Sequence, residues 1–312
     1  MFRLDPMRIA LMVLMLAGLE TAAIFGGFFG REIVTEIAIL AILAISLDLA
    51  AGFGGMVSLG HGAIMGLGAY GYALAAQAGL PPWPAAALGV AAAGLGGGLI
   101  GAVAARMQGI FFIMATLAFG QMIWALSFTA GWLGGDNGLG GIDRPSLPFL
   151  GLTDPLSFAS YAVGLLMLVF LLAAAILRSP FGRAYQAVHE NPTRAAALGV
   201  APLRIRAIGF AASSALAGVA GVLAAQHMQF ISPAMMVWTA SGEVLVVLIL
   251  GGIGTLTGPI MGAAVFVGLK YWAAGWTDHW HLVIGILLIA VVMAGGRGLA
   301  GQAEDWWHRA GA

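Results

Sequence analysis

Five ionisable side chains interrupt the apolar segments of this chain and are its first candidates for chemistry. Four are acidic and one is basic: Glu20, Glu36, Asp48, Glu243 and Lys270. A charge near the centre of a membrane span costs about 2.5–3.5 kcal/mol on insertion scales, so each such residue needs a reason to be there. Asp48 adjoins glycines 52–55, where a helix is expected to break, and either caps that break or belongs to a polar path.

A histidine stands in a second setting that could do chemistry. His61 lies within Ser58-Leu-Gly-His-Gly62. Flanking glycines let backbones approach closely, and non-helical backbone at membrane depth occurs where it lines a cavity or is buried in protein. His61 therefore either faces a translocation path or packs as a satisfied buried residue.

The motifs of enzymes and metal sites are missing from the sequence. It has no His-Glu-x-x-His, no Gly-x-Ser-x-Gly and no histidines at metal-ligand spacing. Lys270 is its one lysine and lies in Gly-Leu-Lys-Tyr-Trp, whereas a phosphate-binding P-loop requires Gly-Lys-Ser/Thr. We therefore expect no catalytic residues, no metal and no cofactor on this chain, and any ATP that drives it would bind another chain.

The elements that must position these residues are membrane spans. The chain has 312 residues, of which 61% are hydrophobic and 8% charged, and its net charge is zero. Soluble domains average about 25% charged residues, so the composition predicts an all-α polytopic membrane protein. The balanced charge gives no reason to expect nucleic acid as a partner. No hydrophilic segment is long enough to fold alone, so residues 1–312 are expected to form a single transmembrane domain.

About ten spans, with eight or nine as alternatives, fit the roughly 20 apolar residues that a crossing needs. We place them near 8–29, 33–52, 56–78, 84–105, 109–129, 157–177, 205–228, 240–256, 258–276 and 281–296. With both termini cytoplasmic, ten of the thirteen basic residues fall on the cytoplasmic side, as the positive-inside rule requires. Two Gly-rich stretches, each containing Gly-x-Ile-Met-Gly at 62–66 and 258–262, predict broken helices.

Residues 179–202, which we call the elbow, form a polar and basic island between two spans. Ser179 followed by Pro180 predicts the start of one short helix. Asn191 followed by Pro192 predicts the start of a second, which Gly199 would end. An apolar stripe on the first helix, formed by Phe181, Ala184, Tyr185 and Val188, suits insertion into a partner's groove or contact with the membrane surface.

Three blocks of sequence resemble the branched-chain amino acid ABC importer permeases, and within them the M-type permease subunit. The first runs from Ser46-Leu-Asp-Leu through Ser58-Leu-Gly-His-Gly62 to Tyr70. The second joins Ala115-Thr-Leu-Ala-Phe-Gly120 to Gly134-Gly-Asp-Asn-Gly138. The third runs from Ser179-Pro-Phe-Gly-Arg183 to Leu250-Gly-Gly-Ile-Gly-Thr-Leu-Thr-Gly-Pro259. Together the blocks cover roughly residues 40–270.

The resemblance implies a subunit of a larger machine in the bacterial inner membrane. Its expected partners are a second homologous permease, two ATPase subunits that bind ATP, and a periplasmic substrate-binding protein, all acting around the lipid bilayer. The elbow would then be the coupling region that rests on an ATPase, with contacts from Phe181, Gly182, Arg183, Tyr185, Arg194, Ala195, Ala196 and Gly199. The translocation path would draw on Asp48, Ser58, His61, Gly62, Thr116, Asn137 and Glu243.

The resemblance leaves the substrate open. Branched-chain or other hydrophobic amino acids are the first expectation, and similar permeases serve urea, short amides and aromatic acids. This chain has Asp48 where the family usually has asparagine, and Arg194 stands near a position where the family's elbow is often acidic. The residues alone also allow an ion-coupled secondary transporter that uses Asp48, Glu243 and Lys270, or a passive solute channel.

Overall fold

The computed structural model describes residues 6–145, 152–276, 279, 281–282, 285–286, 289, 293 and 298–301. Helices dominate it, and the α-helices are α1 (Pro6–Phe25), α2 (Gly27–Ala51), α3 (His61–Gln77), α4 (Pro82–Ala104), α5 (Ile110–Thr129), α6 (Pro155–Arg178), α7 (Pro180–Glu190), α8 (Pro192–Ala197), α9 (Pro202–Met228), α10 (Trp238–Gly251) and α11 (Gly258–Ala274). Short 3-10 helices cover Gly131–Leu133, Gly135–Asn137 and Pro233–Met236. Strands β1 (Leu139–Gly140) and β2 (Phe230–Ile231) pair antiparallel, with Leu139 opposite Ile231.

Five of the described helices are long and apolar enough to cross a membrane. They are α2, α4, α5, α6 and α9. The expectation of an all-α polytopic membrane protein is thus confirmed, but ten full-length spans are not. The predicted spans at 56–78 and 240–256 are shorter in the structure, because their first or last residues belong to non-helical breaks and not to the helices. The predicted span at 281–296 lies mostly outside the described residues.

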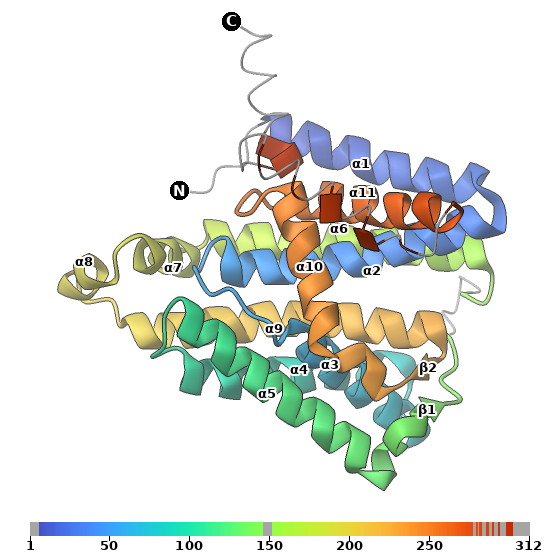
Figure 1. Ribbon diagram of the computed structural model, residues 1–312, viewed down its shortest axis with the longest axis horizontal. Helices are drawn as coiled ribbons and strands as arrows, with labels where there is room; N and C mark the ends of the chain where they lie inside the picture. The colour runs from blue at the N-terminus through green and yellow to red at the C-terminus, as the bar shows by residue number, and fades with distance from the viewer. Residues whose placement is uncertain are drawn as a thin grey trace, which may run out of the picture.

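The long helices form two layers that share α9 (Figure 1). One layer contains α1, α6, α2 and α11, and the other contains α3, α4 and α5. Helix α9 packs against α2 on one side and against α3 and α4 on the other, while α10 crosses between the layers and contacts both α2 and α3. Helices α7 and α8 project at one end of the molecule, and the β1–β2 pair lies at the other (Figure 1).

Small residues set the spacing between α3, α4 and α9. A methyl group on Gly68 of α3 would overlap the backbone of Gly218 on α9, and one on Gly221 would overlap the backbone of α3 at Met65. Apolar lipid gives helices no hydrophobic drive to associate, so such backbone contacts supply the packing energy instead. The high glycine content of the chain is used here for close packing.

Two helix breaks lie against each other at the C-terminal end of α2. The first break, residues 52–60, joins α2 to α3, and the second break, residues 252–257, joins α10 to α11. A methyl group on Gly52 would overlap the backbone of Gly254. Both Gly-x-Ile-Met-Gly motifs lie at the start of a helix that follows a break. The prediction of broken helices at these two stretches is confirmed.

Candidate functional site

Asp48 joins the two breaks. Its side chain is fully buried at the last turn of α2. One carboxylate oxygen accepts a hydrogen bond from the backbone N–H of Gly254 at 2.6 Å, and the other accepts from that of Leu256 at 3.1 Å. These hydrogen bonds satisfy backbone donors that the broken helix leaves open. Asp48 therefore holds the second break in place across 206 residues of sequence.

The second break adopts backbone conformations that depend on this support. Gly252 and Gly254 have φ values of 115° and 77°, and Leu256 has φ of 63°. A left-handed φ is costly for a residue with a branched side chain such as leucine. The hydrogen bond from the Leu256 N–H to Asp48 explains how this conformation is maintained.

Hydroxyl groups satisfy the amides of the first break and of the helix that follows it. The Leu59 N–H donates to Thr116 of α5 at 3.3 Å, and the Gly60 N–H donates to Ser58 at 3.1 Å. The Gly62 N–H donates to Ser241 of α10 at 2.8 Å. These hydroxyl residues are all buried, so protein groups from α5, from α10 and from the break itself hold this segment.

His61 begins α3 and lies in the same buried region. Its Nε2 is 2.9 Å from the hydroxyl of Ser213 on α9, and that hydroxyl donates its proton to the carbonyl of Ser46 at 2.6 Å. Ser213 can then only accept from His61, which places the histidine proton on Nε2 and leaves Nδ1 as an acceptor. Nδ1 is buried and has no hydrogen-bond partner among the described residues.

The structure gathers most, but not all, of the predicted path residues. Asp48, Ser58, His61 and Thr116 are buried around the first break, with Gly62 at the start of α3. Two residues lie elsewhere: Asn137 is exposed in a 3-10 helix near β1, and Glu243 is exposed on α10.

Sequence reasoning missed Ser213 and Ser241, which complete the buried polar cluster. Their signal was a hydroxyl residue within an otherwise apolar helix, a pattern that by itself does not say which backbone group the hydroxyl will meet.

The elbow folds as its cap residues predict. The Ser179 hydroxyl accepts from the Gly182 N–H at 3.1 Å at the start of α7, and the Asn191 side chain accepts from the Arg194 N–H at 2.9 Å at the start of α8. Proline follows each cap. Gly199 ends the second helix with φ of 84°, the left-handed conformation of a glycine helix stop.

Tyr185 of α7 fixes the elbow to the first break. The side chain is 1% exposed. A methyl group on Gly54 would overlap its hydroxyl, and one on Gly209 of α9 would overlap its ring. Burial raises the pKa of the Tyr185 phenol, partly offset by the charge of Arg206. Tyr185 is therefore wedged between two glycines, and one turn further along α7 the His189 ring covers Gly55.

The predicted coupling residues divide into two faces. Gly182, Tyr185 and Ala195 are buried against the chain itself, and Phe181 is half-buried and stacks on Tyr185. The exposed ones are Arg183, Arg194, Ala196 and Gly199. The stripe that includes Tyr185 and Val188 thus packs inward and is not presented to a groove on a partner. Leu198, 79% exposed at the end of α8, stands on the outward surface instead.

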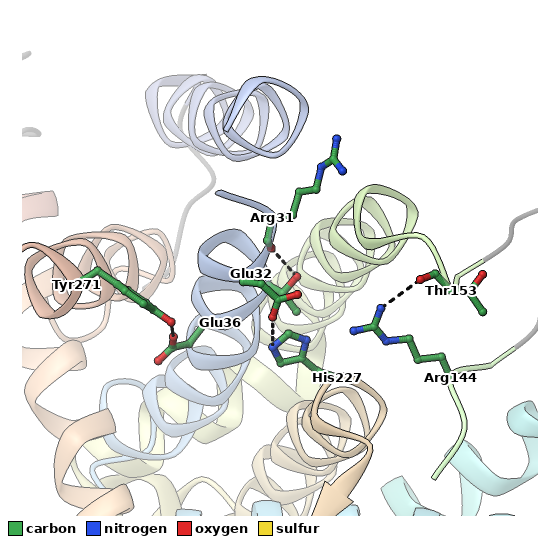
Figure 2. Close-up of polar contacts among 8 residues, drawn as sticks. Arg31, Glu32, Glu36, Arg144, Thr153, His227 and Tyr271 are labelled. Atoms are coloured by element: carbon green, nitrogen blue, oxygen red, sulfur yellow. Dashed lines mark hydrogen bonds and ion pairs between the residues drawn. The ribbon is translucent and has the colours of Figure 1, made fainter. Parts of the chain in front are cut away.

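The opposite end of α2 carries ion pairs (Figure 2). Glu36 accepts from Lys270 at 2.6 Å and from the Tyr271 hydroxyl at 2.8 Å, which ties α2 to α11. Glu32 lies 3.3 Å from His227 of α9. Lys270, which the sequence offered as an ion-coupling group, is therefore engaged with Glu36 in this structure.

Direct contacts link the elbow to the two helix breaks. Among the described residues no group of three or more histidines, cysteines or acids could hold a metal ion. The elbow contacts the first break through Tyr185. Asp48 links the last turn of α2, next to this break, to the second break.

Comparison with known proteins agrees with this description. The family model for "Branched-chain amino acid transport system / permease component" matches residues 29–292. The high-affinity branched-chain amino acid transport system permease proteins LivM of Escherichia coli K12 and Salmonella typhimurium are each 31% identical over 297 residues, covering 86% of this chain and 69% of theirs. The autoinducer 2 import system permease protein LsrC of Klebsiella pneumoniae is 32% identical over 221 residues, covering 64% of this chain and 61% of its own. No solved structure matches.

The match to the family model extends from the start of α2 to beyond α11 and so includes both breaks and the elbow. Together with apolar helices long enough to cross a bilayer, it identifies a multi-pass membrane protein with a role in transport. The chain belongs to the family of branched-chain amino acid transport system permease components.

Proposed function

We propose that this chain is the permease subunit of an ATP-driven importer in the bacterial inner membrane. It carries a small, partly apolar solute by alternating access, with branched-chain or other hydrophobic amino acids as the first substrates to test. In this proposal the chain crosses the membrane about ten times, and the elbow and both termini face the cytoplasm. The basic residues of the elbow support that orientation, since positive charge marks the cytoplasmic side.

The contact that carries the proposal is the wedge of Tyr185 between Gly54 and Gly209. A force on the elbow would reach the first break through this buried ring and the second break through Asp48. Close-packed interiors are stiff, so a displacement of α7 cannot be absorbed locally. The two breaks are then the points at which the membrane helices change their relative angle.

Two features of the chain support the proposed partners: it has no P-loop in its sequence, and its elbow has an exposed surface. This sequence does not contain a phosphate-binding P-loop, so in this proposal two separate ATPase subunits bind the ATP. The exposed elbow residues, Arg183, Arg194, Ala196 and Leu198, offer the surface on which an ATPase would dock. A second homologous permease and a periplasmic substrate-binding protein complete the proposed complex.

The substrate is less constrained than the mechanism. The LivM relatives are named for branched-chain amino acids and the LsrC relatives for autoinducer 2, so permeases similar to this one serve different solutes. Urea, short amides and aromatic acids remain alternatives. In the proposed complex the binding protein selects the solute. The buried hydroxyl groups around the first break are uncharged.

Purification from the native membrane in mild detergent, followed by mass spectrometry, tests the assembly. Recovery of two P-loop ATPases and a second permease supports the proposal, and the accompanying binding protein is then screened for its ligand. The complex is next reconstituted in liposomes and uptake is measured with and without ATP. A chain that purifies alone and transports solute without ATP would overturn the proposal in favour of an ion-coupled transporter or a passive channel.

A further inference from the structure

A cavity of about 200 Å³ opens at the elbow end of the molecule. Its walls include Gly54 and Gly55 of the first break, Gln108 and Gly109 before α5, His189 of α7, Pro192 of α8, and Arg206 of α9. A space of this volume has room for several water molecules or for a small oxyanion.

Arg206 supplies the main polar group of this cavity. It is only 8% exposed, and its guanidinium donates one hydrogen bond at 3.0 Å, to the carbonyl of Met107. A guanidinium carries five N–H donors. Within the described part of the chain, no carboxylate lies at ion-pair distance from it. An arginine that lines a cavity and has no counter-ion can bind an anion from outside the chain.

Two further features of the cavity favour an anion. Gly109 is the N-cap of α5, a helix of 20 residues, and the N-terminus of a helix carries partial positive charge. The segments 105–109 and 178–206 contain six arginines and a single acidic residue, Glu190. Such a field raises the local concentration of anions.

We propose that this cavity binds a small oxyanion, a carboxylate or phosphate group, with Arg206 as its main ligand. The group comes from a free solute on the elbow side or from the headgroup of an anionic lipid. A bound anion would contact the elbow at His189, the first break at Gly55 and the core at Arg206 together. It would therefore hold the elbow on the break and slow transport. That effect on transport rests on the proposed function, whereas binding itself does not.

The absence of cysteine allows a direct binding test. The full-length variant Gln108→Cys, reconstituted in nanodiscs of zwitterionic lipid, carries a single thiol at the cavity wall. Its labelling rate is measured at constant ionic strength with chloride, sodium acetate or inorganic phosphate, and again in nanodiscs that contain phosphatidylglycerol. If the anion is a free solute, we expect labelling to be several-fold slower with acetate or phosphate than with chloride. If the anion is a lipid headgroup, we expect labelling to be slower only in nanodiscs that contain phosphatidylglycerol.

Matched variants assign the effect to the cavity. Leu198→Cys, at an exposed site outside the cavity, should label at the same rate under all conditions. Arg206→Gln in the Gln108→Cys background should abolish protection, and Arg204→Gln, which removes an exposed arginine two residues away, should retain it. His189→Gln provides a second cavity variant if Arg206→Gln does not fold, and it should weaken protection.

Either of two results would overturn the binding proposal: no protection by any of the anions, or equal protection in the Arg204 and Arg206 variants. Neither result depends on whether ATPases copurify with the chain, so this proposal and the proposed function can fail separately.

Discussion

The two ends of α2 are held in contrasting ways. At the elbow end, Asp48 and Tyr185 are buried and contact backbone and glycine directly. At the other end, Glu36 and Lys270 pair through side chains that are 30% and 34% exposed. Buried contacts of the first kind have no solvent to replace them, whereas exposed ion pairs exchange readily with water and salt. The difference fits the proposed function, in which the elbow end transmits displacement while weaker contacts hold the other end.

The largest effect is expected from filling the space under Tyr185. Gly54→Ala forces a methyl group into the tyrosine hydroxyl and ring and into the nearby backbone of α2. Overpacking of this kind costs about 1–3 kcal/mol, and ATP-driven uptake should be lost because the elbow no longer seats. Uptake in proteoliposomes and the melting temperature in detergent measure the two consequences.

Gly164→Ala is the matched control for this substitution. Gly164 lies within α6 and a methyl group there meets no atom within 4 Å. Replacing a helical glycine by alanine should then be neutral or stabilising by about 0.5–1 kcal/mol. Equal losses of uptake and of melting temperature in Gly54→Ala and Gly164→Ala would contradict a specific role for the contact between Gly54 and Tyr185.

The second effect is expected from Asp48, in stability more than in uptake. Asp48→Ala leaves two buried amides, of Gly254 and Leu256, without acceptors, at about 1–3 kcal/mol for each unsatisfied group. Asp48→Asn keeps one acceptor oxygen and should lose less stability while retaining uptake. The melting temperatures of both variants are compared with that of Glu243→Gln, whose exposed side chain should matter little. Loss of uptake in both Asp48→Asn and Glu243→Gln, with folding intact, would favour ion coupling instead.

The ion pairs at the opposite end should contribute less. Lys270→Met removes the partner of Glu36 but leaves the Tyr271 hydroxyl bonded to it. Because the pair is partly exposed, we expect a loss of about 0–1 kcal/mol, which high salt should reduce further. A double-mutant cycle with Glu36→Gln, measured by thermal unfolding at low and high salt, gives the coupling energy. A coupling energy larger than the stability lost in Asp48→Ala would show that the ion-paired end of α2 is the more strongly held end.

The smallest effect should come from the Tyr185 hydroxyl alone. Its oxygen is buried without a hydrogen-bond partner in the described structure, so Tyr185→Phe keeps the ring and should be near-neutral at pH 7. Burial raises the phenol pKa in the folded state, so the folded protein holds this proton more firmly than the unfolded chain. Wild-type stability should therefore fall as pH rises above about 10, the ordinary tyrosine pKa.

Unfolding measured against pH for both proteins tests this. Tyr185→Phe should lose less stability than the wild type on the alkaline side. Parallel curves would show that the phenol titrates no differently in the folded state.

Much of the fold was predictable because its signals are local. Ser179, Asn191 and Gly199 predicted the elbow helices correctly, since a cap acts within one turn of its own helix. The spans of α4, α5, α6 and α9 followed from continuous apolar runs. The predicted spans that adjoin the breaks were too long, because a glycine-rich break is as apolar as the helix it interrupts, and hydropathy cannot separate the two.

The sequence by itself determined that this is a polytopic membrane protein with two broken helices and a capped, basic elbow, because composition, caps and glycine placement act over a few residues. Only the tertiary structure decided what these parts contact. It turned Tyr185 inward onto Gly54, placed Asp48 on the amides of a break 206 residues away, and left Asn137 and Glu243 apart from the buried cluster. Such pairings depend on how α2, α9 and α10 pack together, and no local pattern records that arrangement.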